Sequence, residues 1–343
     1  MAVKAEAVVR AVPRLWQRSP LAVKIGAQFV FAGGLLALLA WRVDVGEVRD
    51  ELRGAELWWL VPAFVFNLVS DLFRAIRWRE FFRPMKVLGV PFLWTVAVLG
   101  VACNLALPLR AGEFVRLQLL RRRTGLSASQ VFATILSEKL LDIVAFGLFL
   151  VLGFVLYEEA RFMWPLAALY GLLLVGGVVG ARWLARRSHD EPALLPQHDG
   201  RWRVWIETHA RGFGSGLQSF LSYRSLGVVS VASVLAWACE SVLYYCCGRA
   251  LGLDLDPAVY LLVVVAATVA VSVPLTQAGI GVFEIALTGL LVAFGVDKSE
   301  AAAFAVFSHV MLALPYFATG PFAALALRVR PGDVLFLRGE KAG

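Results

Sequence analysis

The amino-acid sequence predicts an all-α polytopic membrane protein: six full transmembrane helices plus two re-entrant broken helices in an inverted-topology repeat. Apolar residues make up 59% of the 343 residues and charged residues only 17%, whereas a soluble domain carries about a quarter charged residues. Apolar runs of about 18 residues, long enough to span a bilayer, recur along the chain. The loops between them alternate between basic and acidic, so the net charge of +8 indicates topology rather than a nucleic-acid site.

The first predicted repeat covers residues 1–160 and begins with a basic segment that we place in the cytoplasm. Spans are expected at about 21–41 and 57–76, with the acidic loop between them outside. The charged residues close to the end of the second span are Asp71, Arg74 and Arg77. We expect these side chains to extend toward the cytoplasmic interface.

A short apolar segment then breaks at the stretch NLALPLRAGEF, and both of its flanks are basic. A complete crossing would place one basic flank outside. We therefore predict a re-entrant hairpin of two half-helices over about 90–124, broken at Pro108 and Gly112. Ser127 is expected to cap a long helix that runs to about Tyr157.

The second predicted repeat covers residues 161–330 and has the same order of elements. These are a span at about 165–183, an amphipathic interfacial helix at 201–221, a span at 226–249, a re-entrant hairpin at 258–295 and a long helix at 301–327. The break in the hairpin carries Pro274, Gly279 and Gly281. For the segment at 201–221, the alternative to an interfacial helix is a small soluble helical loop. Residues 331–343 are expected to form a cytoplasmic tail.

The two halves also share local spacing after each break. Gly125 and Ser129 have the same separation as Gly295 and Ser299. Charge counts predict that the first hairpin enters from inside and the second from outside, which is an inverted repeat. Interrupted apolar segments at corresponding places in two inverted halves indicate the midplane site of a transporter. The alternative is that proline and glycine merely kink ordinary spans.

Polar and ionisable side chains near the breaks are the candidate substrate-binding residues, because such groups are costly inside a membrane. They are Asn104, Arg110, Glu113, Arg116, Glu138, Lys139, Asp142, Glu240, Gln277, Glu284 and His309. Arg110, Glu113 and Arg116 recur at i, i+3 and share one helix face, where arginines suit a phosphate. The alternative is a salt-bridged group that anchors the hairpin.

Further candidates lie on the long helices. Glu138 is roughly 16 Å along its helix from Ser127, near mid-bilayer, and Lys139 is placed to pair with Asp142 at i, i+3. A structural ion pair and a role in substrate or proton handling both fit these residues. His309 could relay protons or could simply hydrogen-bond a neighbouring helix.

The stretches NLALPLRAGEFVR and SEKLLD in the first half, and VPLTQAGIGVFE with the helix after Gly295 in the second, carry a resemblance over nearly the whole chain. They resemble the membrane region of the bacterial lysylphosphatidylglycerol synthase/flippase family, whose small stand-alone members are called flippase-like. The resemblance implies a lipid-translocation module. Lys139 stands where an arginine is expected, and Gln277 where a proline or glycine is expected. The aminoacyl-transferase domain of two-function members is missing, so lysine transfer to lipid is not expected.

We therefore expect a flippase- or scramblase-like membrane lipid transporter that moves a charged headgroup between leaflets through a central polar cavity, and not an enzyme. The alternative is a non-transporting subunit that presents a lipid-linked substrate to an envelope-biosynthesis enzyme. An intramembrane enzyme has less support, because the sequence carries no metal-ligand spacing, nucleophile–base pairing or nucleotide-binding loop.

Membrane lipids, either phospholipid or polyprenyl-linked, are the expected partners, with a homodimer or an envelope-biosynthesis enzyme as the protein partner and no nucleic acid. No cofactor or metal is expected, because the four cysteines lie singly or as neighbours in apolar runs. The expected location is the bacterial cytoplasmic (inner) membrane, multi-pass, with both termini cytoplasmic.

Overall fold

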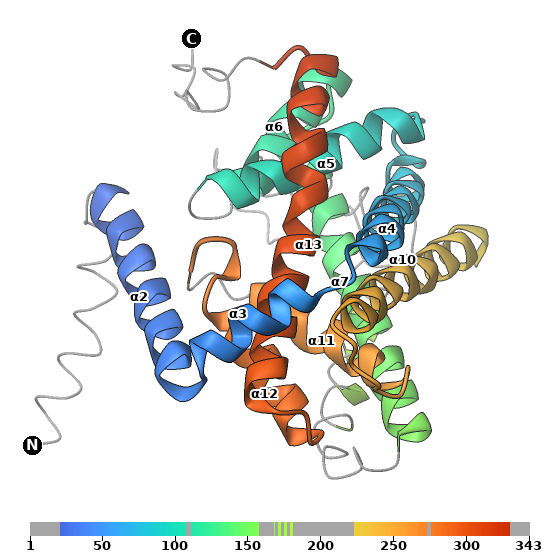
Figure 1. The fold of residues 1–343 in the computed structure, drawn as a ribbon. Helices are drawn as coiled ribbons and strands as arrows, with labels where there is room; N and C mark the ends of the chain where they lie inside the picture. The colour runs from blue at the N-terminus through green and yellow to red at the C-terminus, as the bar shows by residue number, and fades with distance from the viewer. Residues whose placement is uncertain are drawn as a thin grey trace, which may run out of the picture.

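The computed structural model describes residues 21–107, 111–157, 223–272 and 276–329, together with a few helical positions between 168 and 180, and all regular structure in this part of the chain is helical (Figure 1). Several predicted features lie outside the described residues. They are Pro108, Arg110, Pro274, the interfacial helix at 201–221, both termini and most of the span at 165–183.

Four helices in the described residues are long and apolar enough to cross a membrane. They are η1 with α4 (Leu57–Trp59 and Leu60–Phe82), α7 (Ala128–Leu156), α10 (Tyr223–Ala250) and α13 (Lys298–Ala326). A bent pair, α2 (Leu21–Arg42) with α3 (Val45–Gly54), raises the count to five if it forms one span. An all-helical, multi-pass protein is therefore confirmed, and the count of six full spans stays a prediction.

Helix α3 occupies the loop that we expected between the first two spans. The chain bends by 91° between α2 and α3, and Asp44 caps the new helix by accepting hydrogen bonds from the backbone N–H groups of Gly46 and Glu47, at 2.7 and 3.2 Å. Helix α3 packs against α13, where the hydroxyl of Ser299 donates to Glu47 at 2.8 Å. The acidic loop is therefore partly a capped surface helix.

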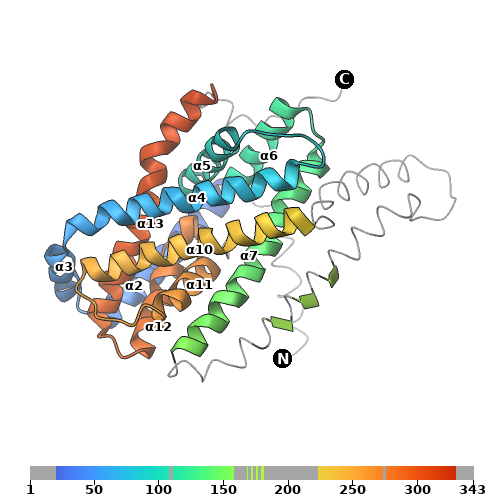
Figure 2. The same cartoon turned by 90° about the vertical axis from the view of Figure 1, so that its right-hand side faces the viewer.

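Helix α4 continues past the predicted end at residue 76. It reaches Phe82, because Arg77 and Glu80 are buried against neighbouring helices rather than extended into a loop. Helix α4 runs antiparallel to α10 and lies along most of its length (Figure 2). The prediction that Asp71, Arg74 and Arg77 extend to the cytoplasmic interface is wrong, since all three point into the protein.

The first predicted hairpin forms two short helices, α5 (Val90–Ala106) and α6 (Ala111–Thr124), which pack side by side. Gly112 allows this close approach, because a Cβ atom there would overlap the carbonyl oxygen of Gly100. The Gly112 N–H donates to the Asn104 side chain at 2.8 Å. The chain breaks where proline and glycine predicted it.

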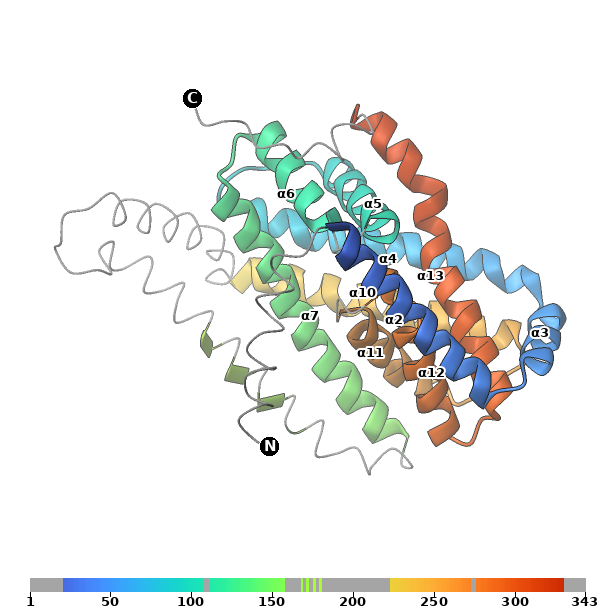
Figure 3. The same cartoon turned by 90° about the vertical axis from the view of Figure 1, so that its left-hand side faces the viewer.

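The second hairpin consists of α11 (Val259–Ser272), the short helix η5 (Gln277–Gly279) and α12 (Val282–Ala293). Ala278, Gly279 and Gly281 have φ values of +54°, +83° and +85°, in the left-handed region that favours glycine. Helix α2 lies across this hairpin (Figure 3), and a Cβ on Gly281 would lie only 2.7 Å from Leu35. For both hairpins, a re-entrant path through a bilayer stays a prediction.

One set of helix ends, those of α4, α6 and α13, is held together by polar contacts. The C-terminal end of α13 lies at the top of Figure 1. The Lys86 ammonium donates to the carbonyl of Thr124 at 2.8 Å, and Arg123 donates to the carbonyl of Leu327 at 2.6 Å. Both ends of the α5–α6 hairpin therefore lie together. These are the ends that the basic flanks predict to share one side of the membrane.

A second set of ends gathers at the opposite end of the molecule. Glu47 meets Ser299 there, and the backbone N–H of Glu56 donates to the carbonyl of Ala250 at 2.7 Å. All four residues lie in segments that were predicted to be outside. The grouping agrees with the predicted alternation of sides, while the assignment of the basic end to the cytoplasm stays a prediction.

Candidate functional site

A cavity of about 530 Å³ lies between the hairpins and the long helices. Its walls include every candidate binding residue except two: Arg110 is outside the described residues, and Glu284 lies behind His309. The candidates that line it are Asn104, Glu113, Arg116, Glu138, Lys139, Asp142, Glu240, Gln277 and His309. Residues far apart in the sequence thus share one polar interior, although their function there stays a prediction.

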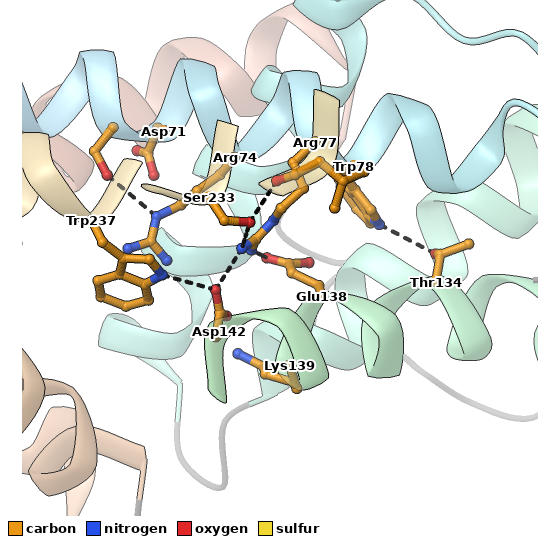
Figure 4. Close-up of polar contacts among 12 residues, drawn as sticks. Asp71, Arg74, Arg77, Trp78, Thr134, Glu138, Lys139, Asp142, Ser233 and Trp237 are labelled. Carbon is orange, nitrogen blue, oxygen red and sulfur yellow. Dashed lines mark hydrogen bonds and ion pairs between the residues drawn. The ribbon is translucent and has the colours of Figure 1, made fainter. Parts of the chain in front are cut away.

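Arg77 lies behind the cavity-lining residues Glu138 and Asp142 and connects α4 with α7 and α10 (Figure 4). Its side chain is 0% exposed. One terminal nitrogen donates to Asp142 at 2.7 Å and to the hydroxyl of Ser233 at 3.2 Å, and the other lies 3.6 Å from Glu138. The indole N–H of Trp237 also donates to Asp142, at 3.2 Å. Asp142 is therefore held from α4 and α10 together.

Two other charged groups on α4, Arg74 and Asp71, do line the cavity. Arg74 forms an ion pair with Glu240, and its guanidinium carbon lies 4.2 Å from the centre of the Trp237 ring. Asp71 accepts a hydrogen bond from the hydroxyl of Tyr316 at 3.1 Å. The sequence contained a signal for them, because three charges at i, i+3 spacing inside an apolar span define one polar helix face.

The first hairpin contacts α7 through two ion pairs. Arg116 donates to Glu138 at 2.6 Å and stacks 4.0 Å above the Trp78 ring, well buried. Glu113 lies 3.7 Å from Lys139, and these two side chains are 35% and 44% exposed. The predicted pairing of Lys139 with Asp142 is wrong, because Glu113 takes the lysine and Arg77 takes the aspartate.

Gln277 connects the two chain breaks. Its side-chain amide nitrogen lies 3.1, 3.0 and 2.8 Å from the carbonyl oxygens of Asn104, Leu105 and Leu107. These carbonyls belong to the C-terminal end of α5, where backbone acceptors have no partner within the helix. The residue that replaces an expected proline or glycine therefore caps the broken helix of the other hairpin.

His309 lies against the same break from the side of α13. Its Nδ1 is 2.6 Å from Glu284 Oε1, and its Nε2 is 3.2 Å from the carbonyl oxygen of Ala278. The second carboxylate oxygen of Glu284 accepts from the Gly281 N–H at 2.6 Å. The histidine does hydrogen-bond a neighbouring helix, and its partner there is ionisable.

The charges that line the cavity have both signs. The carboxylates are Asp71, Glu113, Glu138, Asp142 and Glu240, and the basic groups are Arg74, Arg116 and Lys139. Each of them has a hydrogen-bond or ion-pair partner within the described chain. The cavity wall therefore carries mutually paired charges of both signs, not an unopposed positive surface.

Comparison with known proteins gives a family match over most of the chain. The family model described as "Lysylphosphatidylglycerol synthase TM region" matches residues 25–320. This range includes both hairpins and every cavity residue named above.

Several curated archaeal proteins are similar to the chain. It is 26% identical to glycosyltransferase AglD of Haloferax volcanii over 92% of its own length, but it spans only 57% of that protein. It is also 26% identical to a UPF0104 membrane protein of Methanothermobacter thermautotrophicus, over 83% of this chain and 93% of that one. A UPF0104 membrane protein of Pyrococcus horikoshii is 22% identical over 78% of this chain and 86% of its own. Because these relatives are archaeal, the bacterial location stays a prediction.

Proposed function

The chain belongs to the family described as the lysylphosphatidylglycerol synthase TM region, and from this premise we propose that it moves a charged lipid headgroup between the two leaflets of a membrane. The observation that carries the proposal is the cavity of about 530 Å³, lined by charges of both signs inside a bundle of apolar helices. A headgroup crosses hydrocarbon slowly because its charged groups lose their hydration. The cavity offers replacement partners while the acyl chains stay in the bilayer.

The partly exposed pair of Glu113 and Lys139 is the place where exchange of partners costs least. Both side chains retain contact with solvent, and their 3.7 Å separation is loose for a salt bridge. In this proposal a phosphate takes Lys139, while an ammonium group or sugar hydroxyls take Glu113. The shorter and deeper pairs hold the walls of the path.

A second candidate is a membrane subunit that presents a lipid-linked substrate to an enzyme. It is favoured by the relative named glycosyltransferase AglD, of which this chain matches only 57%. In that case the cavity would hold the lipid without carrying it across, and a separate catalytic domain or protein would act on it.

The test is reconstitution of the purified chain into liposomes with fluorescent lipids that a membrane-impermeant reagent quenches only in the outer leaflet. Without ATP, the protein should speed the exchange of at least one lipid class, either a phospholipid or a polyprenyl-linked lipid. Val101 lines the cavity, so Val101→Trp places a larger side chain in it and should lower the rate at least about tenfold. Val310→Trp adds the same bulk on an exposed face of α13 and should leave the rate unchanged.

Equal rates for the two tryptophan variants would contradict a path through this cavity. If folded protein accelerates neither lipid class but binds a polyprenyl-linked lipid in a manner that Val101→Trp abolishes, the substrate-presenting subunit replaces transport as the function.

A further inference from the structure

The His309 ring is held between two oxygen atoms that normally accept hydrogen bonds. The carbonyl oxygen of Ala278 can only accept, so a hydrogen bond at this contact requires a hydrogen on Nε2. Nδ1 faces Glu284 Oε1 at 2.6 Å, a separation that is short even for a charge-assisted hydrogen bond. Two hydrogen bonds at these contacts therefore require a proton on each side of the ring.

Counting protons defines the state of this pair. A neutral imidazole has one ring hydrogen and can satisfy only one of these contacts. With the hydrogen on Nε2, the Nδ1 lone pair faces a carboxylate lone pair at 2.6 Å; with it on Nδ1, the Nε2 lone pair faces the carbonyl oxygen of Ala278 at 3.2 Å. One additional proton on the pair gives each contact a hydrogen. Both side chains are buried, with 9% and 5% of the residue surface exposed. Loss of the proton would leave an unpaired negative charge in the interior, which is costly.

The surrounding charged groups leave this proton to the pair itself. From α12 only Glu284 faces the ring, and α5 carries no charged residue. Helices α4 and α10 present Asp71, Arg74 and Glu240, which bond with Tyr316 and with one another. Glu47 of α3 meets α13 at Ser299, roughly 15 Å along that helix from His309. His309 lines the cavity, so a proton can reach it from there.

The pair also holds the break between α11 and α12 in shape. His309 binds the carbonyl of Ala278, and Glu284 binds the N–H of Gly281, so the two side chains close a ring around residues 278–281. Ala278 has a φ of +54°, a conformation that a residue with a Cβ adopts only when its surroundings enforce it. The neighbouring Gln277 caps the end of α5. The contact between the two hairpins therefore depends on a segment that the pair stabilises.

We propose that His309 and Glu284 form a proton-binding site, and that its occupancy fixes the contact between the two broken helices and so couples headgroup movement to protons. The coupling rests on the proposed transport function, whereas the proton-dependent contact does not. At low pH the pair is loaded and segment 276–285 is closed against α5. As the pH rises the pair loses its proton, one of the two contacts of the ring loses its hydrogen, and the segment loosens.

The test is hydrogen–deuterium exchange of the purified full chain in nanodiscs, read by mass spectrometry for amides 276–285 between about pH 5.5 and about pH 8.5. After correction for the intrinsic pH dependence of amide exchange, protection should fall at least about tenfold as the pH rises, as expected for loss of one charge-assisted hydrogen bond. Glu284→Gln keeps an acceptor for Gly281 and donates to a neutral Nδ1, so it imitates the loaded pair, and its protection should not change with pH. Asp254→Asn removes a fully exposed carboxylate and should behave as the unmodified chain.

Protection of 276–285 that is independent of pH in the unmodified chain would overturn the proposal, whatever the variant does. Lipid exchange in liposomes at the same pH values separates the two ideas. If the segment responds to pH but no lipid moves, the proton site stands and the transport function fails. If lipid moves and Glu284→Gln keeps the same pH dependence of the rate as the unmodified chain, the coupling fails and transport stands.

Discussion

A charged side chain inside a membrane protein is costly unless it has partners of opposite charge, and Arg77 has two carboxylates on α7 and a hydroxyl on α10 beside it. Its partners are Asp142, Glu138 and the hydroxyl of Ser233, at 2.7, 3.6 and 3.2 Å. Such a buried pair adds little net stability compared with apolar packing, but breaking it leaves an uncompensated charge. Arg77 therefore fixes the positions of α4, α7 and α10 relative to one another, and we call this contact the lock.

Arg77→Ala should lower the free energy of unfolding by about 3–5 kcal/mol, because Asp142 and Glu138 would be left facing each other without their shared cation. Asp142→Ala should be similarly destabilising. The double variant should cost clearly less than the sum of the two, since it removes both charges. Denaturant unfolding in detergent micelles, followed by intrinsic tryptophan fluorescence, measures all three.

Arg53→Ala is the matched control, because Arg53 is 63% exposed and its pair with Asp50 is a loose 3.9 Å. That substitution should change stability by no more than about 1 kcal/mol. Additive effects of Arg77→Ala and Asp142→Ala would show that the two residues do not form a unit, and the lock would be rejected.

The positions of the candidate site residues were predictable from the sequence, whereas their partners were not. Ionisable groups within apolar runs mark the polar interior of a bundle, and this found Glu138 and Asp142. Spacing along one helix suggested Lys139 as the partner of Asp142. The actual partner, Arg77, lies on α4, and no local pattern records which helices become neighbours. Asp71 and Arg74 were assigned to the interface because the predicted end of their helix was too early.

At the scale of elements, proline and glycine predicted the breaks between α5 and α6 and between α11 and α12. Each has a direct backbone reason: proline lacks an N–H, and glycine permits positive φ or close packing. The end of α4 was misjudged, because an arginine-rich stretch resembles a loop flank. Arg83 instead lies at the C-terminal end of the helix, where it pairs with Glu80 at 3.1 Å, one turn away. Helix α3 was missed because its charges suggested only a polar loop.

Gly112→Ala should separate α5 from α6 and destabilise the protein by about 1–3 kcal/mol or more, since the new Cβ would overlap the Gly100 carbonyl. The hydrogen bond from the Gly112 N–H to Asn104 would be strained as well. Thermal unfolding and lipid exchange of the same preparation report both effects.

Gly289→Ala is the control for that substitution. Gly289 lies within α12, and nothing lies within 4 Å of a Cβ built there. Alanine at this position should be neutral or stabilising by up to about 1 kcal/mol. A stable and fully active Gly112→Ala variant would show that the close packing of this hairpin is not required.

At the scale of the whole molecule, the helix ends gather into two groups at opposite ends of the structure, and each group corresponds to one predicted side of the membrane. Basic segments meet where Lys86 contacts Thr124 and Arg123 contacts Leu327. The segments with acidic flanks meet where Glu47 contacts Ser299. One hairpin has both of its ends at the first site, and the other hairpin ends in Phe294, whose ring lies 5.3 Å from that of Tyr157 at the far end of α7. Two hairpins that start from opposite ends are what an inverted repeat requires.

The final prediction is that Val87 and Arg122, which flank the α5–α6 hairpin and are both exposed, share one side of the membrane, and that Asp254 lies on the other. Basic flanks place the first pair in the cytoplasm. Single cysteines at these positions, in a chain whose four native cysteines are replaced, can be labelled in whole cells and in inverted vesicles with a membrane-impermeant maleimide. Val87→Cys and Arg122→Cys should react only in inverted vesicles, and Asp254→Cys only in whole cells.

A complete crossing of α5 and α6 would separate residues 87 and 122 by the full membrane, which is incompatible with the 2.8 Å contact between Lys86 and Thr124. Labelling of Val87→Cys and Arg122→Cys from opposite sides would therefore refute the hairpin and the inverted repeat together, whereas uniform reversal of all three would refute only the orientation.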